Sequence, residues 1–241
     1  MSKMRLDKLL SELGVASRKE LRDIIRRGRV SVDGVTVTVP EQKVDAETAE
    51  IRLDGEALRW QRFRYFMMDK PEGVLSVTED RRQQTVLDLL PDELKRLGLF
   101  PVGRLDKDTS GLLLLTNDGD FAHRVISPKS GVEKRYRAEV EGVPDERDVR
   151  AFGEGIVLAD GTKCLPAKLE TTGESVCCVT VMEGKYHQVK RMLAACGKPV
   201  TKLRRLSVGA LTLDENLAPG GVRELSQADL CKVLSDFAIG N

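Results

Sequence analysis

Aromatic residues, long apolar runs and cysteine pairs are scarce in this chain of 241 residues. Aromatics make up only 4% of it, which argues against a sheet that stacks bases on rows of Phe and Tyr. No apolar run approaches the roughly 20 residues that a membrane-spanning helix needs, and the first residues, MSKMRLDKLLSELG, are too charged for a secretory signal. The five cysteines lack any CxxC spacing, which indicates reduced thiols and not a disulfide framework or zinc site. We therefore expect a cytoplasmic protein without a membrane segment.

Length and charge distribution indicate two units that each offer a surface to a polyanion. A chain of 241 residues is long for one domain and short for three, and 41% hydrophobic residues suffice for packed cores. The net charge of +1 conceals separate blocks: residues 1–40 hold nine Lys or Arg against five Asp or Glu, whereas residues 41–58 hold two against six. The stretch from Gly184 to Leu213 has seven basic residues and no acidic one. Such blocks suit RNA, although a basic run can equally be an ordinary solvated face.

The first sixty residues predict a small helix-helix-hairpin module. Leucines spaced along residues 6–13 form one apolar helix face that ends at Gly14. Ser17 followed by Glu20 is typical of a capping box that opens a second helix, and Gly28 suits its C-terminal end. Valines then alternate with polar residues on both sides of Asp33-Gly34, which predicts a hairpin over residues 30–39.

The string RLDKLLSELGVASRKELRDIIRRGRVSVDG resembles the RNA-binding module named after small-subunit ribosomal protein four, over Arg5 to about Leu58. Modules of this kind hold structured RNA mainly through its phosphates. The resemblance therefore implies RNA contacts from the basic residues of the two helices, namely Arg5, Lys8, Arg18, Lys19, Arg22 and Arg26. By itself, the module implies RNA binding and does not indicate a catalysed reaction.

We expect residues 1–58 to form the module, residues 59–64 a linker and residues 65–241 a second domain. The second half of the acidic segment 41–58 predicts one more strand. Strands are expected over 65–70, 112–116, 135–140 and 176–182, and helices over 85–90, 119–126, 145–152, 187–196 and 226–237. Because many neighbouring strands are joined by turns, the pattern favours an α+β fold with a mixed, mainly antiparallel sheet over a doubly wound parallel sheet.

The polar loop GRLDKDTSG, residues 103–111, is the best candidate for a reactive site, because it lies between the break at Pro101 and a leucine-rich strand. A carboxylate such as Asp106 can act as a nucleophile, a base or a metal ligand. Asp106 and Asp108 could form the carboxylate pair of a glycosidase, or one of them could cap the turn. The residue types alone leave these alternatives open.

The longer segment GRLDKDTSGLLLLTNDG resembles the catalytic motif of pseudouridine synthases, and specifically of the RsuA-type branch. Three further segments agree in order: MDKPEG at 68–73, EKRYRAEVEG at 133–142 and EGKYHQVKRML at 183–193. The resemblance implies an isomerase that breaks the bond between ribose and N1 of uracil and rejoins the base through carbon 5. This reaction involves no net redox change, so we expect no cofactor and no metal, in agreement with the absence of nucleotide-loop and metal motifs.

The resemblance also implies roles for individual residues. Asp106 is the essential carboxylate, Lys190 is the basic partner that keeps it ionised, and Tyr136 packs against the target base. A uridine in folded RNA must leave the base stack, and Arg104 matches the residue that fills the vacated space. Further RNA contacts are expected at Lys134, His187, Gln188 and Arg191. Without the resemblance, Lys190 could instead contact a phosphate and Tyr136 could be a core residue.

The form YHQVKRM, which contains Tyr186-His187, resembles the subfamily that acts on small-subunit ribosomal RNA. Relatives acting on the large subunit more often have Asn-Arg at these two positions, so large-subunit RNA is the alternative substrate. We expect a monomer whose partner is ribosomal RNA, free or in an assembling particle. Two other classes stay open: a non-enzymatic RNA-binding assembly protein, and a carboxylate glycosidase that would release free uracil.

Overall fold

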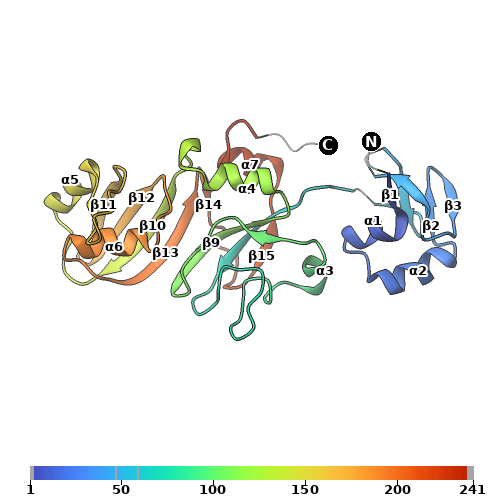
Figure 1. The fold of residues 1–241 in the computed structure, drawn as a ribbon, viewed down its shortest axis with the longest axis horizontal. Coiled ribbons are helices and arrows are strands. Elements are labelled where there is room, and N and C mark those ends of the chain that lie inside the picture. The colour runs from blue at the N-terminus through green and yellow to red at the C-terminus, as the bar shows by residue number, and fades with distance from the viewer. Residues whose placement is uncertain (1–2, 47, 59, 238–241) are drawn as a thin grey trace. The chain divides into compact units, whose positions relative to one another are not determined.

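The computed structural model describes residues 3–46, 48–58 and 60–237, and the chain divides into two compact units (Figure 1). The first unit extends to Arg64 and also includes Leu90–Leu99, which contains the short helix α3 (Asp92–Lys95). The second unit comprises Tyr65–Leu89 and the chain from Phe100 onward. Arg59, at the start of the expected linker, lies outside the described residues.

Within the N-terminal unit, the described residues up to Leu58 form two helices and short strands, as the sequence predicts. These elements are β1 (Lys3–Arg5), α1 (Leu6–Glu12), α2 (Arg18–Arg26), β2 (Val30–Val32), β3 (Val35–Val37), β4 (Lys43–Asp45), β5 (Ile51–Leu53) and β6 (Glu56–Leu58). The expected capping box is present, because the Ser17 side chain accepts from the Glu20 backbone and the Glu20 carboxylate accepts from the Ser17 backbone. The acidic segment contributes β4 and the β5–β6 hairpin, where one strand was expected.

Apolar faces of both helices close over the small four-stranded sheet β3-β2-β5-β6. Leu6, Leu9 and Leu10 of α1 and Leu21 and Ile25 of α2 are fully buried in one cluster. These are the positions that helical spacing assigns to the inside of the module. The module therefore has a hydrophobic core of its own.

A nine-stranded sheet forms the centre of the second unit, with the path β11-β12-β10-β13-β9-β7-β15, β14 paired to β13 and β8 paired to β9. Its strands are β7 (Tyr65–Lys70), β8 (Phe100–Pro101), β9 (Thr109–Thr116), β10 (Lys134–Val140), β11 (Lys168–Gly173), β12 (Val176–Val181), β13 (Val200–Val208), β14 (Leu211–Thr212) and β15 (Val222–Glu224). Among the described strands of this sheet, only β9 and β13 pair in parallel. The expected α+β class with a mainly antiparallel sheet is confirmed.

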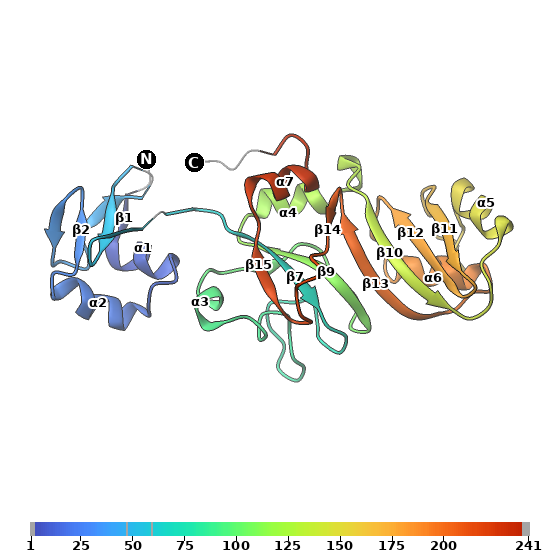
Figure 2. The same ribbon diagram turned by 180° about the vertical axis from the view of Figure 1, so that it is seen from behind.

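Helices pack at two places along this sheet (Figures 1 and 2). They are α4 (Gly119–Ile126), α5 (Glu146–Glu154), α6 (Gln188–Ala195) and α7 (Gln227–Val233), together with a short 3-10 turn at Pro128–Ser130. Phe152 of α5 and Met192 of α6 share a core cluster with β10, β12 and β13. At the other place, Phe121 of α4 packs edge-to-face on Tyr65 of β7 and on Phe237.

The second unit differs from the sequence prediction in one expected helix and in several strands, since β8, β11, β14 and β15 were not predicted. The helix expected over 85–90 is wrong: the Asp88 carboxylate accepts from the backbone and hydroxyl of Thr85, and the chain forms a turn before Pro91. The strand β13 was not predicted, because its segment VTKLRRLSV reads as a basic surface stretch. The other four expected helices are present, although α7 ends at Val233 and not at Phe237.

Candidate active site

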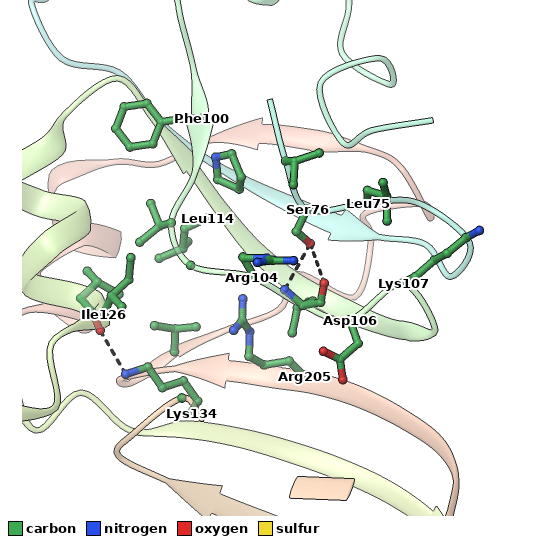
Figure 3. A pocket seen from close by; sticks show the side chains of 18 of the residues that line it. Leu75, Ser76, Phe100, Arg104, Asp106, Lys107, Leu114, Ile126, Lys134 and Arg205 are labelled. Atoms are coloured by element: carbon green, nitrogen blue, oxygen red, sulfur yellow. Dashed lines mark hydrogen bonds between the residues drawn. The ribbon is translucent and has the colours of Figure 1, made fainter. Parts of the chain in front are cut away.

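Asp106 lies in the loop between β8 and β9, and backbone contacts hold this loop in place. The Ser76 hydroxyl donates to the carbonyl of Leu105 at 2.9 Å and accepts from its N–H at 3.2 Å (Figure 3). Gly103 begins the loop in the left-handed region, with φ of 77°. Pairing of β9 with both β7 and β13 then fixes the far end of the loop.

A fully buried lysine, Lys70 at the end of β7, holds the same loop through hydrogen bonds to its backbone. Its ammonium donates to the carbonyls of Asp106 at 3.1 Å and Thr109 at 2.9 Å, and also to those of Pro71 and Lys107. Burial lowers the pKa of Lys70 to about 8, against the opposing effect of Asp108 and Asp106. The MDKPEG motif is part of the family resemblance, but no role was predicted for Lys70. A lysine that ends the otherwise apolar run YFMM was the available signal.

The side chain of Asp106 meets a cation from the first turn of α6. Lys190 Nζ lies 3.1 Å from Asp106 Oδ2 and 2.5 Å from Asp108 Oδ1. Burial opposes the charged form of Lys190, but its hydrogen bonds to Asp108 and Asp106 outweigh burial and raise its pKa. The hydrogen bond from Lys190 likewise lowers the pKa of Asp108. The expected juxtaposition of Asp106 and Lys190 is thus present, and Lys190 is shared with Asp108.

His187 completes the surroundings of the Asp106 carboxylate, with Nε2 at 3.4 Å from Oδ1. Its backbone has φ of 48°, a conformation that a residue with a side chain adopts only when its surroundings impose it. The ring of the exposed Tyr186 stacks on His187 with 3.9 Å between centroids. Both rings line the cavity that contains Asp106.

The buried carboxylate of Glu183 and the amide of Gln188 hold this segment in shape. Glu183 accepts from the backbone of Leu165 at 2.9 Å and from Gln188 Nε2 at 2.8 Å, and it forms an ion pair with Lys185. The Gln188 amide oxygen accepts from the Lys185 backbone at 2.9 Å. An RNA contact at Gln188 stays a prediction, and the structure gives its amide a role inside the protein.

Tyr136 of β10 lies opposite Arg205 of β13, and Arg205 Nη1 is 3.5 Å from the Tyr136 hydroxyl. Arg205 also donates from Nε to the carbonyl of Leu112 at 2.7 Å, while Lys134 donates to the carbonyl of Val125 at 3.0 Å. These three side chains line one cavity of about 1150 Å³ together with Asp106 and the exposed Arg104. Figure 3 shows Arg205, Lys134, Asp106 and Arg104 around this cavity. The cavity brings together Asp106, Tyr136 and Arg104, as the sequence predicts.

Most of the other expected RNA contacts have an acidic partner inside the protein, because Lys8 lies 3.6 Å from Glu12, Arg22 lies 3.7 Å from Asp7 and Arg26 lies 3.9 Å from Asp23. Arg191 pairs with Asp160 at 2.6 Å and donates to the carbonyl of Tyr186. Arg5 is held by Asp7 and Glu41. The remaining module residues are exposed on α1 and α2: Lys8, Arg18, Lys19, Arg22 and Arg26.

Within residues 3–46, 48–58 and 60–237, no group of three or more His, Cys, Asp or Glu side chains is arranged to hold a metal ion. Over the same residues, no helix combines the length and the apolar character that crossing a membrane requires. All five cysteines are free thiols, and Cys164, Cys177 and Cys178 are buried.

Comparison with known proteins identifies the class that this fold and site define. A family model for RNA pseudouridylate synthase matches residues 64–195, and an S4 domain model matches residues 4–50. A crystal structure of a pseudouridylate synthase aligns with a TM-score of 0.68 and 36% identity, covering 96% of this chain and all of the other. The chain belongs to the RNA pseudouridylate synthase family, with an S4 domain at its N-terminus, and is an isomerase acting on RNA.

Two bacterial relatives illustrate the similarity over almost the full length. An uncharacterized RNA pseudouridine synthase of Bacillus subtilis is 47% identical over 231 residues, which cover 94% of this chain and 97% of the relative. The ribosomal small subunit pseudouridine synthase A of Vibrio cholerae is 42% identical over 231 residues, which cover 95% and 99%. The resemblance to the RsuA-type branch is therefore confirmed.

Proposed function

We propose that this enzyme converts a specific uridine of small-subunit ribosomal RNA into pseudouridine, with Asp106 as nucleophile and without a cofactor. The observation that carries the proposal is the Asp106 carboxylate, which faces a cavity of about 1150 Å³ with Lys190 at 3.1 Å. A nucleophilic carboxylate has to stay ionised where water is partly excluded, and an adjacent ammonium provides this. Support for the small subunit comes from the named Vibrio relative and from the Tyr186-His187 pair.

In this mechanism the target uridine leaves its stack and enters the cavity, while Arg104 occupies the space that it vacates. Asp106 attacks the flipped nucleotide, at the ribose carbon or at the base, and the bond between ribose and N1 breaks. The base turns and bonds to the ribose through carbon 5. The carbon-5 proton is lost, N1 gains one, and the Asp106 carboxylate is regenerated. Tyr136 packs against the base, with its hydroxyl held by Arg205.

The N-terminal module of residues 1–58 binds RNA electrostatically, and the linker of residues 59–64 joins it to the catalytic domain of residues 65–241. Such tethering raises the local concentration of the catalytic domain on RNA without choosing the base. In this proposal the enzyme acts as a monomer in the cytoplasm. Its partner is ribosomal RNA, either free or in an assembling particle, and His187 and Arg191 contact that RNA beside the cavity.

The test of the proposed reaction is release of tritium from RNA labelled at carbon 5 of uridine, because the label leaves only when that carbon is substituted. We expect release from small-subunit RNA and little from large-subunit RNA. Greater release from large-subunit RNA would identify that RNA as the substrate. Free uracil among the products would indicate a glycosidase. Tight binding without release from either RNA or from partly assembled particles would indicate a non-enzymatic RNA-binding protein.

A further inference from the structure

We propose that Lys134 and Arg205 form a phosphate-binding site inside the catalytic cavity, which holds a phosphate flanking the target uridine. This inference rests on the proposed function in taking RNA as the ligand. It assigns to Arg205 a role that the resemblance does not supply, and it gives the RNA contact expected at Lys134 a defined chemical partner.

Both side chains are buried, with Lys134 only 8% exposed and Arg205 only 5% exposed. They project from neighbouring antiparallel strands, β10 and β13. Burial and, as a smaller effect, the positive charge of Arg205 together lower the pKa of Lys134 to about 8, so the two cations repel each other.

No carboxylate neutralises these two cations among the residues that the structure describes. The partners of Lys134 and Arg205 are neutral oxygens, two of them backbone carbonyls and one the Tyr136 hydroxyl. The neighbouring cations behave differently: Arg204 pairs with the buried Asp69 at 2.8 Å, and Lys190 pairs with Asp106 and Asp108. Buried positive charge without a counter-ion is unfavourable, and a bound anion removes that penalty.

The cavity places this cation pair within the site that receives the nucleotide. Figure 3 shows Lys134, Arg205 and Asp106 around one cavity, and its volume of about 1150 Å³ exceeds what a single nucleoside needs. RNA carries one phosphate on each side of every nucleoside, so a phosphate necessarily accompanies the flipped uridine. The planar guanidinium of Arg205 suits two-pronged binding of phosphate oxygens, and the Lys134 ammonium adds a point charge.

The test compares binding of uridine 3′,5′-bisphosphate and of uridine to the full-length protein by calorimetry. Wild type should bind the bisphosphate more tightly, and Lys134→Met should lose about tenfold or more of bisphosphate affinity while its affinity for uridine stays unchanged. Lys134→Arg keeps the charge and should keep the preference for the bisphosphate. Lys202→Met is the control: it removes an equal charge from an exposed position of β13, the strand that carries Arg205, and it should also keep the preference for the bisphosphate.

Three results would overturn the phosphate site: equal affinity of wild type for the two ligands, an equal loss with Lys202→Met, or an equal loss of uridine and bisphosphate affinity with Lys134→Met. The last result would mean that Lys134 contacts the base or is needed for a stable fold. Thermal unfolding of the same variants separates these two roles. Because the readout is affinity, failure of wild type to release tritium would contradict the proposed reaction and leave this comparison intact.

Discussion

At the scale of single residues, two lysines act on the catalytic loop from different sides. Lys190 provides a positive charge 3.1 Å from the Asp106 carboxylate, whereas Lys70 ties the carbonyls of Asp106 and Thr109 to the end of β7. Lys190 therefore acts on the charge of Asp106, the proposed nucleophile, and Lys70 acts on its position. The two roles predict different phenotypes.

Replacing Lys190 by Met should lower the rate of the bound enzyme by about a hundredfold, because one preorganised charge at the reacting group is lost. Lys190→Arg keeps the charge and should retain part of the rate. Single-turnover kinetics at saturating RNA measures both. A Lys190→Met enzyme with the wild-type rate and weaker RNA binding would show that this lysine is a phosphate contact.

The depressed pKa of Lys70 predicts a specific pH dependence of stability. Its pKa falls from the ordinary value of 10.5 to about 8 in the folded protein, so the unfolded chain binds more protons between these values. The free energy of unfolding of wild type relative to Lys70→Met should therefore rise from about pH 8 to about pH 10.5, by at most about 1.4 kcal/mol per pH unit. Urea unfolding at several pH values measures this difference. If the difference in unfolding free energy does not change with pH, folding does not desolvate the Lys70 ammonium, which would contradict the account.

At the scale of elements, the parallel pairing of β9 with β13 builds the site, because it sets the end of the Asp106 loop beside Arg205. Gly111 of β9 is in register with Arg205 and has φ of 104°. A Cβ at Gly111 would lie 2.2 Å from the carbonyl oxygen of Arg205. Only glycine permits this approach of the two strands.

Gly111→Ala should reduce the free energy of unfolding by about 2 kcal/mol or more, from backbone strain together with the steric clash. Gly161→Ala is the matched control, because Gly161 has φ of 81° but open space around its Cβ direction. Denaturant midpoints of the two variants separate the clash from the strain. Equal losses of unfolding free energy in the two variants would mean that β9 and β13 can move apart without a further loss of stability.

The same elements show what the sequence could and could not predict. The leucine run of β9 and the Ser17–Glu20 capping box are local signals, and they placed the Asp106 loop and the start of α2 correctly. In β13, the inward side of the alternation includes Arg205, and a buried arginine cannot be distinguished from a surface one by polarity. The turn at Thr85 uses the contacts of a helix cap, so the local signal alone favoured a helix.

At the scale of the whole molecule, the module proposed to bind RNA and the domain proposed to carry out the reaction have separate hydrophobic cores. The module buries its leucines in one cluster, and the catalytic cavity is lined by residues of the second unit alone. The basic face of α2 has exposed arginines at positions 22 and 26, one helical turn apart. This separation predicts that the affinity for RNA and the bound-state rate can be changed independently.

Replacing both Arg22 and Arg26 by Gln should weaken RNA binding and reduce the salt dependence of the affinity by about one phosphate contact per arginine. The rate at saturating RNA should not change. Arg147 and Arg150 are exposed on α5 and form the matched control, whose replacement should have little effect on affinity. Equal losses of affinity for the two pairs, or a slower saturated rate for the module variant, would contradict the division of labour.

The most direct test of the central claim is tritium release from carbon-5-labelled small-subunit RNA by wild type and by Asp106→Asn. The substitution preserves the size of the side chain and removes the carboxylate beside Lys190 that we propose as the nucleophile. We predict release with wild type, none with Asp106→Asn, and similar RNA affinity for the two proteins. Release by Asp106→Asn at the wild-type rate would contradict the assignment of Asp106 as the nucleophile.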